Sequence, residues 1–258
     1  MKCNQTVKDF FDFINSIAPF EAQCEWDNSG LVVGSFDAEV KKIGVVLDIT
    51  SDAVKYAAEN GIDLIVSHHP VIFRAVKTFL ADDIPFMLAQ NGISAICAHT
   101  SLDIAKGGVN DALAEALGFK NATPLTDFGE ESMVKVVETD EITADELAKL
   151  VADKLSTCVT VADGGKTIRK IALCGGAGAD FFEKAKCDAY ITGEVKHHEY
   201  LQALECGITL IAAGHFETEN PVVSALAEKL KNIFSCEVEI IPQNSPVKYF
   251  NRGKNYAP

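Results

Sequence analysis

Residues 62–70 read Ile-Asp-Leu-Ile-Val-Ser-His-His-Pro, and this stretch decides how the rest of the chain is interpreted. The apolar, β-branched run from Ile62 to Val66 is typical of a short buried strand. The run ends at two adjacent imidazoles, His68 and His69. Because two buried histidines without polar partners would cost several kcal/mol, the pattern predicts that they share a polar or metallic partner.

The remaining histidines follow the same pattern, since each comes shortly after an apolar run. They are His99 after residues 95–98, His197 and His198 after 189–193, and His215 after 209–213. A single histidine in such a place is more often a satisfied core or surface residue than a ligand. The recurrence of all six at predicted strand ends reverses that preference and favours a common site.

Alternation of strand and helix patterns predicts an α/β protein. A strand at 42–47, a helix that ends at Asn60-Gly61 with Ser51 as its cap, and the strand at 62–66 form a βαβ unit, whose strands should be parallel. The pattern restarts near residue 125. We therefore predict two α/β lobes of mostly parallel βαβ units. Residues 1–124 with 190–258 would form the first lobe, which carries most of the site, and 125–189 the smaller second lobe.

The ends of parallel strands share one edge of a sheet, where ligand crevices form. Imidazoles and carboxylates meet there in the predicted fold, namely His68, His69, Asp103, His215 and Glu219. Mixed nitrogen and oxygen donors suit zinc, manganese, iron, cobalt or nickel better than calcium. These donors exceed the needs of one tetrahedral ion, so we predict two ions about 3.5 to 4 Å apart.

Spacing leaves some details of this site open. It does not separate Glu217 from Glu219 as the donor. His215 and Glu219 are predicted to lie on a turn, because Asn220-Pro221 is expected to begin the last long helix.

Composition narrows the classes of protein. A formal charge of −14 over 258 residues argues against a general nucleic-acid binder. The eight cysteines are scattered without a C-x-x-C pair, which favours reduced core thiols over disulfides or a zinc knuckle. No apolar run approaches the roughly 20 residues of a membrane span, and the N-terminus lacks a signal segment. We expect a cytoplasmic protein.

Two loops have both a structural and a functional interpretation. The glycine-rich turn at 174–180 follows a strand and precedes a predicted amphipathic helix, so its amides could bind a phosphate. Its spacing fits neither the dinucleotide fingerprint nor the P-loop, and a tight turn with close packing is favoured. The segment 25–30 holds the only tryptophan, either in a loop with a packed indole or at a functional site.

Several motifs together resemble the GTP cyclohydrolase 1 type 2 family, also called the NIF-three-like proteins. They occur in family order across residues 26–219: Trp26-Asp27-Asn28-Ser29-Gly30, Ser67-His68-His69-Pro70, His99-Thr100-Ser101-Leu102-Asp103, Gly175-Gly176-Ala177-Gly178, Thr192-Gly193-Glu194 and Gly214-His215-Phe216-Glu217-Thr218-Glu219. The doubled histidine and the late His-x-x-x-Glu are the specific ones. The length resembles that of the short family members, which lack an inserted central domain.

The resemblance implies a two-lobed subunit with a dinuclear metal site, assembled into a ring-shaped homohexamer. It implies the same metal ligands, with Asp103 and Glu219 as candidates to bridge the ions. His198 matches a family histidine near the metals and would be the general acid or base. Its neighbour His197 stands where relatives commonly carry an aromatic residue, so the role of the pair stays open.

The family name implies hydrolytic opening of the guanine imidazole ring of GTP, giving formate and dihydroneopterin triphosphate. Arg74, Lys77 and Lys196 could hold the triphosphate, although such side chains usually only solvate a surface. Two alternatives remain: a different dinuclear metallohydrolase, acting on phosphoesters or damaged metabolites, and a non-enzymatic metal-binding interaction protein.

Overall fold

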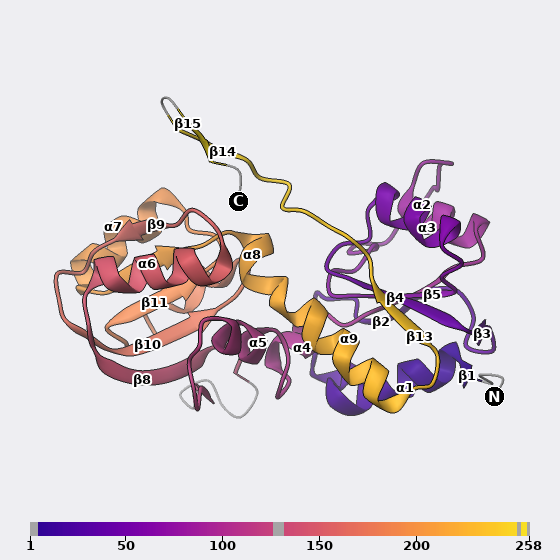
Figure 1. Ribbon diagram of the computed structural model, residues 1–258, viewed down its shortest axis with the longest axis horizontal. Helices are drawn as coiled ribbons and strands as arrows, with labels where there is room; N and C mark the ends of the chain where they lie inside the picture. Colours follow the sequence, from indigo (N-terminus) through magenta and orange to yellow (C-terminus); the bar gives the residue numbers. More distant parts are fainter. Residues whose placement is uncertain (1–4, 126–131, 252–253, 257–258) are drawn as a thin grey trace. The chain divides into compact units, whose positions relative to one another are not determined.

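The computed structural model describes residues 5–125, 132–251 and 254–256, and Figure 1 shows its helices and strands. The chain divides into two compact units. Unit 1 comprises Met1–Gly108 and Val222–Gln243, and unit 2 comprises Val109–Pro221 and Asn244–Pro258. Each unit has its own sheet, so each is described separately.

Unit 1 is built on a five-stranded sheet in the order β13-β4-β5-β6-β2. The strands are β2 (Gly30–Val33), β4 (Lys42–Val46), β5 (Leu64–Ser67), β6 (Ser94–Cys97) and β13 (Glu237–Ile240). The first four strands in this order are parallel, and only β2 pairs antiparallel with β6. The predicted βαβ unit is confirmed, because β4 and β5 are parallel neighbours. A small antiparallel pair joins β1 (Gln5–Thr6) to β3 (Glu39–Val40).

Helices cover both faces of this sheet (Figure 1). They are α1 (Val7–Ile17), α2 (Ser51–Glu59), α3 (Ile84–Gln90), the short α4 (Thr100–Ile104) and, from Val222, α9 (Pro221–Ile233). One face packs on α2 and α3 through Val54, Ile65 and Leu88. On the other face, the ring of Phe10 on α1 lies 4.2 Å from that of Phe234, just after α9.

Local capping residues set where these helices begin. The backbone N–H of Thr6 donates to Asp9 Oδ2 over 2.7 Å at the start of α1. The cap of α2 is Thr50 and not the predicted Ser51, because the Thr50 hydroxyl accepts from the Ala53 N–H over 3.2 Å. Ser51 is already the first residue of the helix.

Unit 2 is built on a six-stranded sheet in the order β7-β8-β10-β11-β12-β9. The strands are β7 (Thr123–Pro124), β8 (Lys135–Ile142), β9 (Thr160–Ala162), β10 (Ile168–Cys174), β11 (Ala189–Thr192) and β12 (Thr209–Ala212). The central strands β10, β11 and β12 are parallel, whereas β7, β8 and β9 pair antiparallel. An antiparallel pair of strands, β14 (Tyr249–Asn251) and β15 (Lys254–Tyr256), belongs to the same unit.

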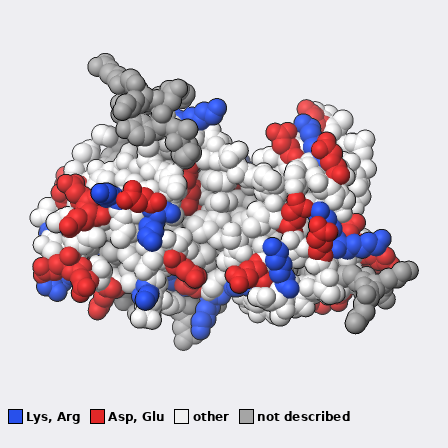
Figure 2. All heavy atoms as spheres, in the orientation of Figure 1, with Lys and Arg blue, Asp and Glu red and all other residues white. Residues whose placement is uncertain are grey.

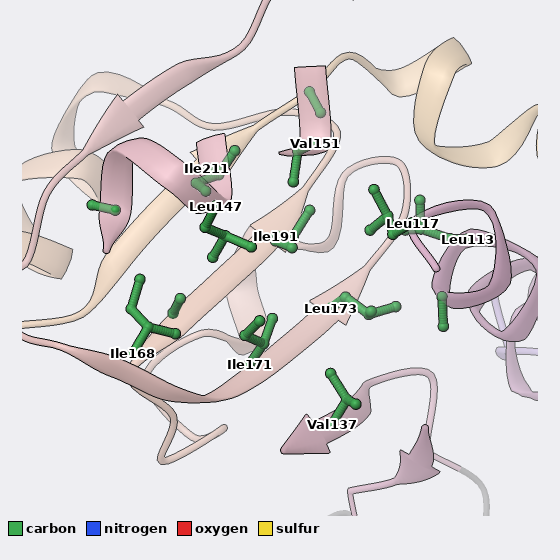
Figure 3. Packing of buried hydrophobic residues seen from close by; sticks show 14 residues of the cluster. Leu113, Leu117, Val137, Leu147, Val151, Ile168, Ile171, Leu173, Ile191 and Ile211 are labelled. Atoms are coloured by element: carbon green, nitrogen blue, oxygen red, sulfur yellow. The ribbon is translucent and has the colours of Figure 1, made fainter. Parts of the chain in front are cut away.

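Alternating side chains give this sheet two buried faces, the pattern expected of strands covered on both sides. Ile171 and Leu173 pack with residues of α5 (Val109–Ala116) and α6 (Ala144–Leu155), as Figure 3 shows. Ala172 and Cys174 point to the opposite face, which packs on residues that include Ala203 of α7 (His197–Cys206). The last helix of the unit, α8 (His215–Glu219), follows β12 directly.

The observed fold differs from the sequence-based prediction in the extent of unit 2, in the type of its sheet and in one helix. Unit 2 begins at Val109, before the predicted boundary at 125, and it contains β11 and β12, which were expected in the first lobe. Its sheet is mixed, not mostly parallel. No amphipathic helix follows β10; a 3-10 helix spans Gly178–Phe181. The pairing of β10 with β11 and β12 depends on residues distant in sequence, which a local pattern does not report.

The surface and the cysteines agree with a globular chain. Figure 2 shows acidic and basic side chains interspersed on the face in view. The cysteines of the described residues are free thiols, and Cys97, Cys174 and Cys187 are buried, as predicted. In the part of the chain that the structure describes, no helix is both long and apolar enough to cross a membrane.

Candidate metal centre

Three imidazoles of unit 1 meet at the ends of two parallel strands. His68 and His69 follow β5 directly, and His99 follows its neighbour β6 after one residue. The ring centroids lie 4.7 Å apart for His68 and His69, 5.1 Å for His68 and His99, and 5.4 Å for His69 and His99. One ring nitrogen from each lies within 4.8 Å of the others. The cluster therefore offers three convergent nitrogen donors.

An oxygen acceptor fixes the orientation of each ring. His68 Nδ1 lies 2.9 Å from the carbonyl of Ala98, His69 Nδ1 lies 2.8 Å from Asp48 Oδ1, and His99 Nδ1 lies 2.9 Å from Asp27 Oδ1. Since a carbonyl or carboxylate only accepts, each Nδ1 carries the proton and Nε2 of the neutral ring carries the lone pair. Such contacts commonly orient histidines that bind metals through the other nitrogen.

Asp27 is held by an unusually complete set of donors. Its Oδ2 accepts from the N–H of Thr100 over 2.9 Å and from the Thr100 hydroxyl over 2.5 Å. Its side chain is fully buried. Burial alone would raise the pKa of Asp27, but the hydrogen bonds from His99 and Thr100 outweigh it and hold the pKa well below its usual range. The carboxylate is therefore charged and keeps His99 in place.

A carboxylate completes the donors of unit 1. Asp103 lies on α4, one turn after His99, and its Oδ1 is 3.7 Å from His68 Nε2. The structure thus brings together three predicted site residues, His68, His69 and Asp103. His99, Asp27 and Asp48 were not in the predicted set. For His99 the signal was present, because it follows a strand as the others do.

Unit 2 carries the second pair of predicted donors. His215 and Glu219 begin and end α8, and His215 Nε2 lies 3.1 Å from Glu219 Oε2. The prediction that they lie on a turn is wrong, since these residues form a helix and are one turn apart. His215 Nδ1 lies 3.1 Å from Glu194 Oε1, so this ring is also held by a carboxylate.

The glycine-rich turn after β10 lets α8 approach the strand ends. Gly176 has a φ of 60°, and a Cβ there would lie 2.0 Å from Glu219 Oε1. The amide of Gly175 donates to Asn110 Oδ1, and that of Gly176 donates to the Thr218 hydroxyl. Because these amides are used within the chain, the structure supports the tight-turn interpretation over a phosphate loop.

The donor chemistry of each unit fits a divalent transition ion. Unit 1 offers oriented imidazole nitrogens beside the carboxylate of Asp103, and unit 2 offers the imidazole of His215 beside the carboxylate of Glu219. Such mixed nitrogen and oxygen sets suit zinc, iron, manganese, cobalt or nickel, whereas calcium prefers oxygen alone.

A comparison with protein families identifies the chain. The family described as Duf34/NIF3 (NGG1p interacting factor 3) matches residues 5–246. The chain belongs to the Duf34/NIF3 family. This confirms the resemblance seen in the sequence motifs.

Two relatives of this Duf34/NIF3 protein align with it over most of its length. A protein of Clostridium perfringens named GTP cyclohydrolase 1 type 2 homolog is 35% identical over an alignment of 250 residues, and the match covers 91% of this chain and 95% of the relative. A Helicobacter pylori protein named GTP cyclohydrolase 1 type 2 is 34% identical over an alignment of 230 residues, and the match covers 87% of this chain and 91% of the relative.

Solved structures share the fold of this chain. Staphylococcus aureus protein SA1388 superposes with a TM-score of 0.89 at 26% identity, over 96% of this chain and all of that one. Reduced HcgD from Methanocaldococcus jannaschii superposes with a TM-score of 0.81 at 29% identity, over 92% of this chain and 98% of that one. The fold is therefore that of a known group of proteins.

The predicted catalytic residue of this Duf34/NIF3 member, His198, is an exposed side chain. His198 is exposed in the first turn of α7, next to the exposed His197. Neither ring has a hydrogen bond or ion pair within the residues that the structure describes. Arg74, Lys77 and Lys196 are exposed as well, and Lys196 forms an ion pair with Glu199 over 3.3 Å.

Proposed function

We propose that the protein is a divalent-metal-dependent hydrolase that opens the imidazole ring of guanine in GTP, releasing formate and giving dihydroneopterin triphosphate. The carrying observation is the cluster of His68, His69 and His99, whose rings are each oriented through Nδ1. An orientation of this kind prepares Nε2 for a metal. The relatives named GTP cyclohydrolase 1 type 2 supply the substrate class.

In this proposal, two ions of zinc, manganese, iron, cobalt or nickel would be held by His68, His69, Asp103, His215 and Glu219. Asp103 and Glu219 would be the candidates to supply a carboxylate to both ions. When bound, such ions lower the pKa of water and stabilise developing negative charge. The chain itself orients the donors: Asp48 holds His69, Glu194 holds His215, and Asp27 holds His99 at the edge of the cluster.

His198 is the proposed general acid or base, because its imidazole is exposed and so accessible to a substrate. His198→Gln is expected to lower kcat about 10²- to 10⁴-fold, the range for a proton-transfer group, without changing metal content. His197→Gln is the matched control, since it removes the neighbouring exposed imidazole. Equal losses in both variants would contradict this role.

The reaction is tested by incubating metal-loaded protein with GTP and measuring formate and, after oxidation, the fluorescent pterin. We expect both products with at least one of the five metals, and neither product with chelator-treated protein or with His68→Ala. Absence of both products under all metal loadings would overturn the proposed reaction. A panel of phosphoesters and damaged metabolites would then test the alternative that the protein is a different dinuclear metallohydrolase.

We also propose that the chain assembles as a ring-shaped homohexamer. Exposed apolar side chains on residues 76–86 support an assembly that would cover them, namely Val76, Phe79, Leu80 and Phe86. Light scattering after gel filtration should give about 167 kDa, six times the chain mass of 27.8 kDa. A mass of a single chain at micromolar concentration would contradict the hexamer.

A further inference from the structure

The only tryptophan of the chain is exposed beside the imidazole cluster. Trp26 is 61% exposed, although an indole is among the most favourable side chains to bury. Its ring lies 5.8 Å from that of His99 at an interplanar angle of 72°. An exposed indole at this place, next to polar donors, needs an explanation other than core packing.

The backbone that carries Trp26 is held firmly. The next residue, Asp27, accepts hydrogen bonds from His99 and Thr100, and the Asp27 N–H donates to the carbonyl of Cys24 over 2.9 Å. The hydroxyl of Ser29 accepts from the His99 N–H over 3.0 Å. The exposure of the indole is therefore a consequence of an ordered turn that is bound to the cluster itself.

A second exposed aromatic ring approaches the same imidazole. Phe73 is 47% exposed, and its ring lies 5.5 Å from that of His99 at an interplanar angle of 88°. A hydrogen bond ties its loop to the tryptophan turn, since Asn28 Nδ2 donates to the carbonyl of Ile72 over 2.6 Å. Two half-exposed aromatic rings thus contact one imidazole from linked loops.

We propose that Trp26 and Phe73 form the binding surface for a planar nitrogen heteroaromatic ring, a purine base, and hold it beside the imidazole cluster. Aromatic side chains bind such rings by stacking, at about 1–3 kcal/mol per base. The choice of a purine rests on the proposed function, in which the ring that opens belongs to guanine. The surface would then bring the reacting five-membered ring next to the metal donors.

One exposed basic residue is next to this surface in sequence. Arg74 directly follows Phe73, so a nucleotide whose base stacks on Phe73 would have a guanidinium available for its phosphates. The base, and not the phosphate, is the group that the aromatic pair recognises. Guanosine should therefore bind to the pair, whereas tripolyphosphate should not.

Because Trp26 is the only tryptophan, its fluorescence reports on this surface alone. The assay titrates metal-free and metal-loaded protein with GTP, guanosine and tripolyphosphate, with excitation at the red edge of the indole band. We expect saturable quenching by GTP and by guanosine and none by tripolyphosphate. Phe73→Ala should weaken the guanosine affinity roughly tenfold, equivalent to about 1.4 kcal/mol.

Matched variants separate stacking from a general loss of aromatic surface. Phe36→Ala is the control, because Phe36 is similarly exposed at 41% but its ring contacts that of Phe11. It should leave the titration unchanged. By calorimetry, Trp26→Ala should weaken GTP binding roughly 10- to 100-fold, and Trp26→Phe should restore most of it.

The outcomes distinguish this inference from the proposed reaction. Quenching by guanosine without any formate from GTP would support the aromatic surface and overturn the reaction. Formate production with an unchanged KM in Trp26→Ala and Phe73→Ala would support the reaction and overturn the surface. Fluorescence that responds only to protein concentration and not to guanosine would also overturn it, and would assign these rings to contact between copies of the chain.

Discussion

Asp48 offers a sharp test of how the metal donors are oriented. Its Oδ1 accepts from His69 Nδ1 over 2.8 Å, and the Asp48 side chain is 44% exposed. Its backbone is held independently, because Gln243 Oε1 accepts from the Asp48 N–H and Gln243 Nε2 donates to the Asp48 carbonyl. Replacement of this side chain should therefore alter the orientation and basicity of His69 and leave the fold intact.

The magnitude follows from the type of hydrogen bond that is lost. A bond to a charged acceptor contributes about 1.5–3 kcal/mol and a neutral one about 1 kcal/mol. Asp48→Asn keeps a neutral acceptor, so zinc affinity should fall ~5- to 30-fold, the equivalent of ~1–2 kcal/mol. Asp48→Ala removes the acceptor and should lower the affinity roughly 10- to 100-fold, the range for groups that orient a ligand.

The assay is competition for zinc against a fluorescent chelator at constant pH and salt. Asp52→Asn is the control, because Asp52 is a 90% exposed carboxylate whose ion pair, within the described residues, is with Lys55. Circular dichroism should be unchanged in all variants, which would show that the fold is intact. The reasoning is refuted if Asp48→Ala binds zinc as tightly as the unaltered protein, or if Asp52→Asn weakens binding equally.

Three further predictions concern unit 2. Gly176→Ala should lower the metal content, because the added Cβ would displace the Glu219 carboxylate. Gly165→Ala is the control, since Gly165 has a similar φ of 72° but no atom within 4 Å of the added Cβ, and it should lose only about 1 kcal/mol of stability. Equal metal content in the two variants would contradict this prediction. Burial raises the pKa of Cys187 to about 12, so only about 10⁻⁴ of this thiol is thiolate near pH 8. Mass spectrometry should therefore show that iodoacetamide alkylates the exposed Cys206 long before Cys187. Simultaneous labelling of the two cysteines would be inconsistent with a buried Cys187. Thr143→Ala should lower the free energy of unfolding in urea by about 1 kcal/mol, because the Thr143 hydroxyl accepts from the Glu146 N–H at the start of α6. Thr143→Ser keeps the hydroxyl and should lower it little. Similar losses in both variants would argue against helix capping by Thr143.

Local patterns were enough to predict the elements that position the unit 1 donors. The β-branched run before His68 and the strand before His99 were both visible in the sequence. The parallel pairing of β4 with β5 followed from the helix between these two strands. The antiparallel strand β2 was not predicted, because its residues 30–33 form a short run that directly follows the turn-like segment 25–30.

Non-local contacts account for what the sequence did not reveal. The Nδ1 partners Asp27 and Asp48 come from loops that are 72 and 21 residues from their histidines, and no spacing rule links them. Helix α8 was missed because Asn220-Pro221 resembles a helix start, although the residue before Pro221 remains helical here. The extent of unit 2 was missed because it is set by the pairing of strands that are distant in sequence, such as β8 with β10 and β9 with β12.

The most direct test of the account is the position of bound metal. Anomalous diffraction at the zinc edge, from crystals grown with zinc, should show two peaks per chain. At least one should lie about 2.1 Å from Nε2 of His68 or His69, the usual zinc-to-nitrogen distance. Peaks that lie only elsewhere on the surface, or no peak at full zinc loading, would contradict the claim that these oriented imidazoles hold metal.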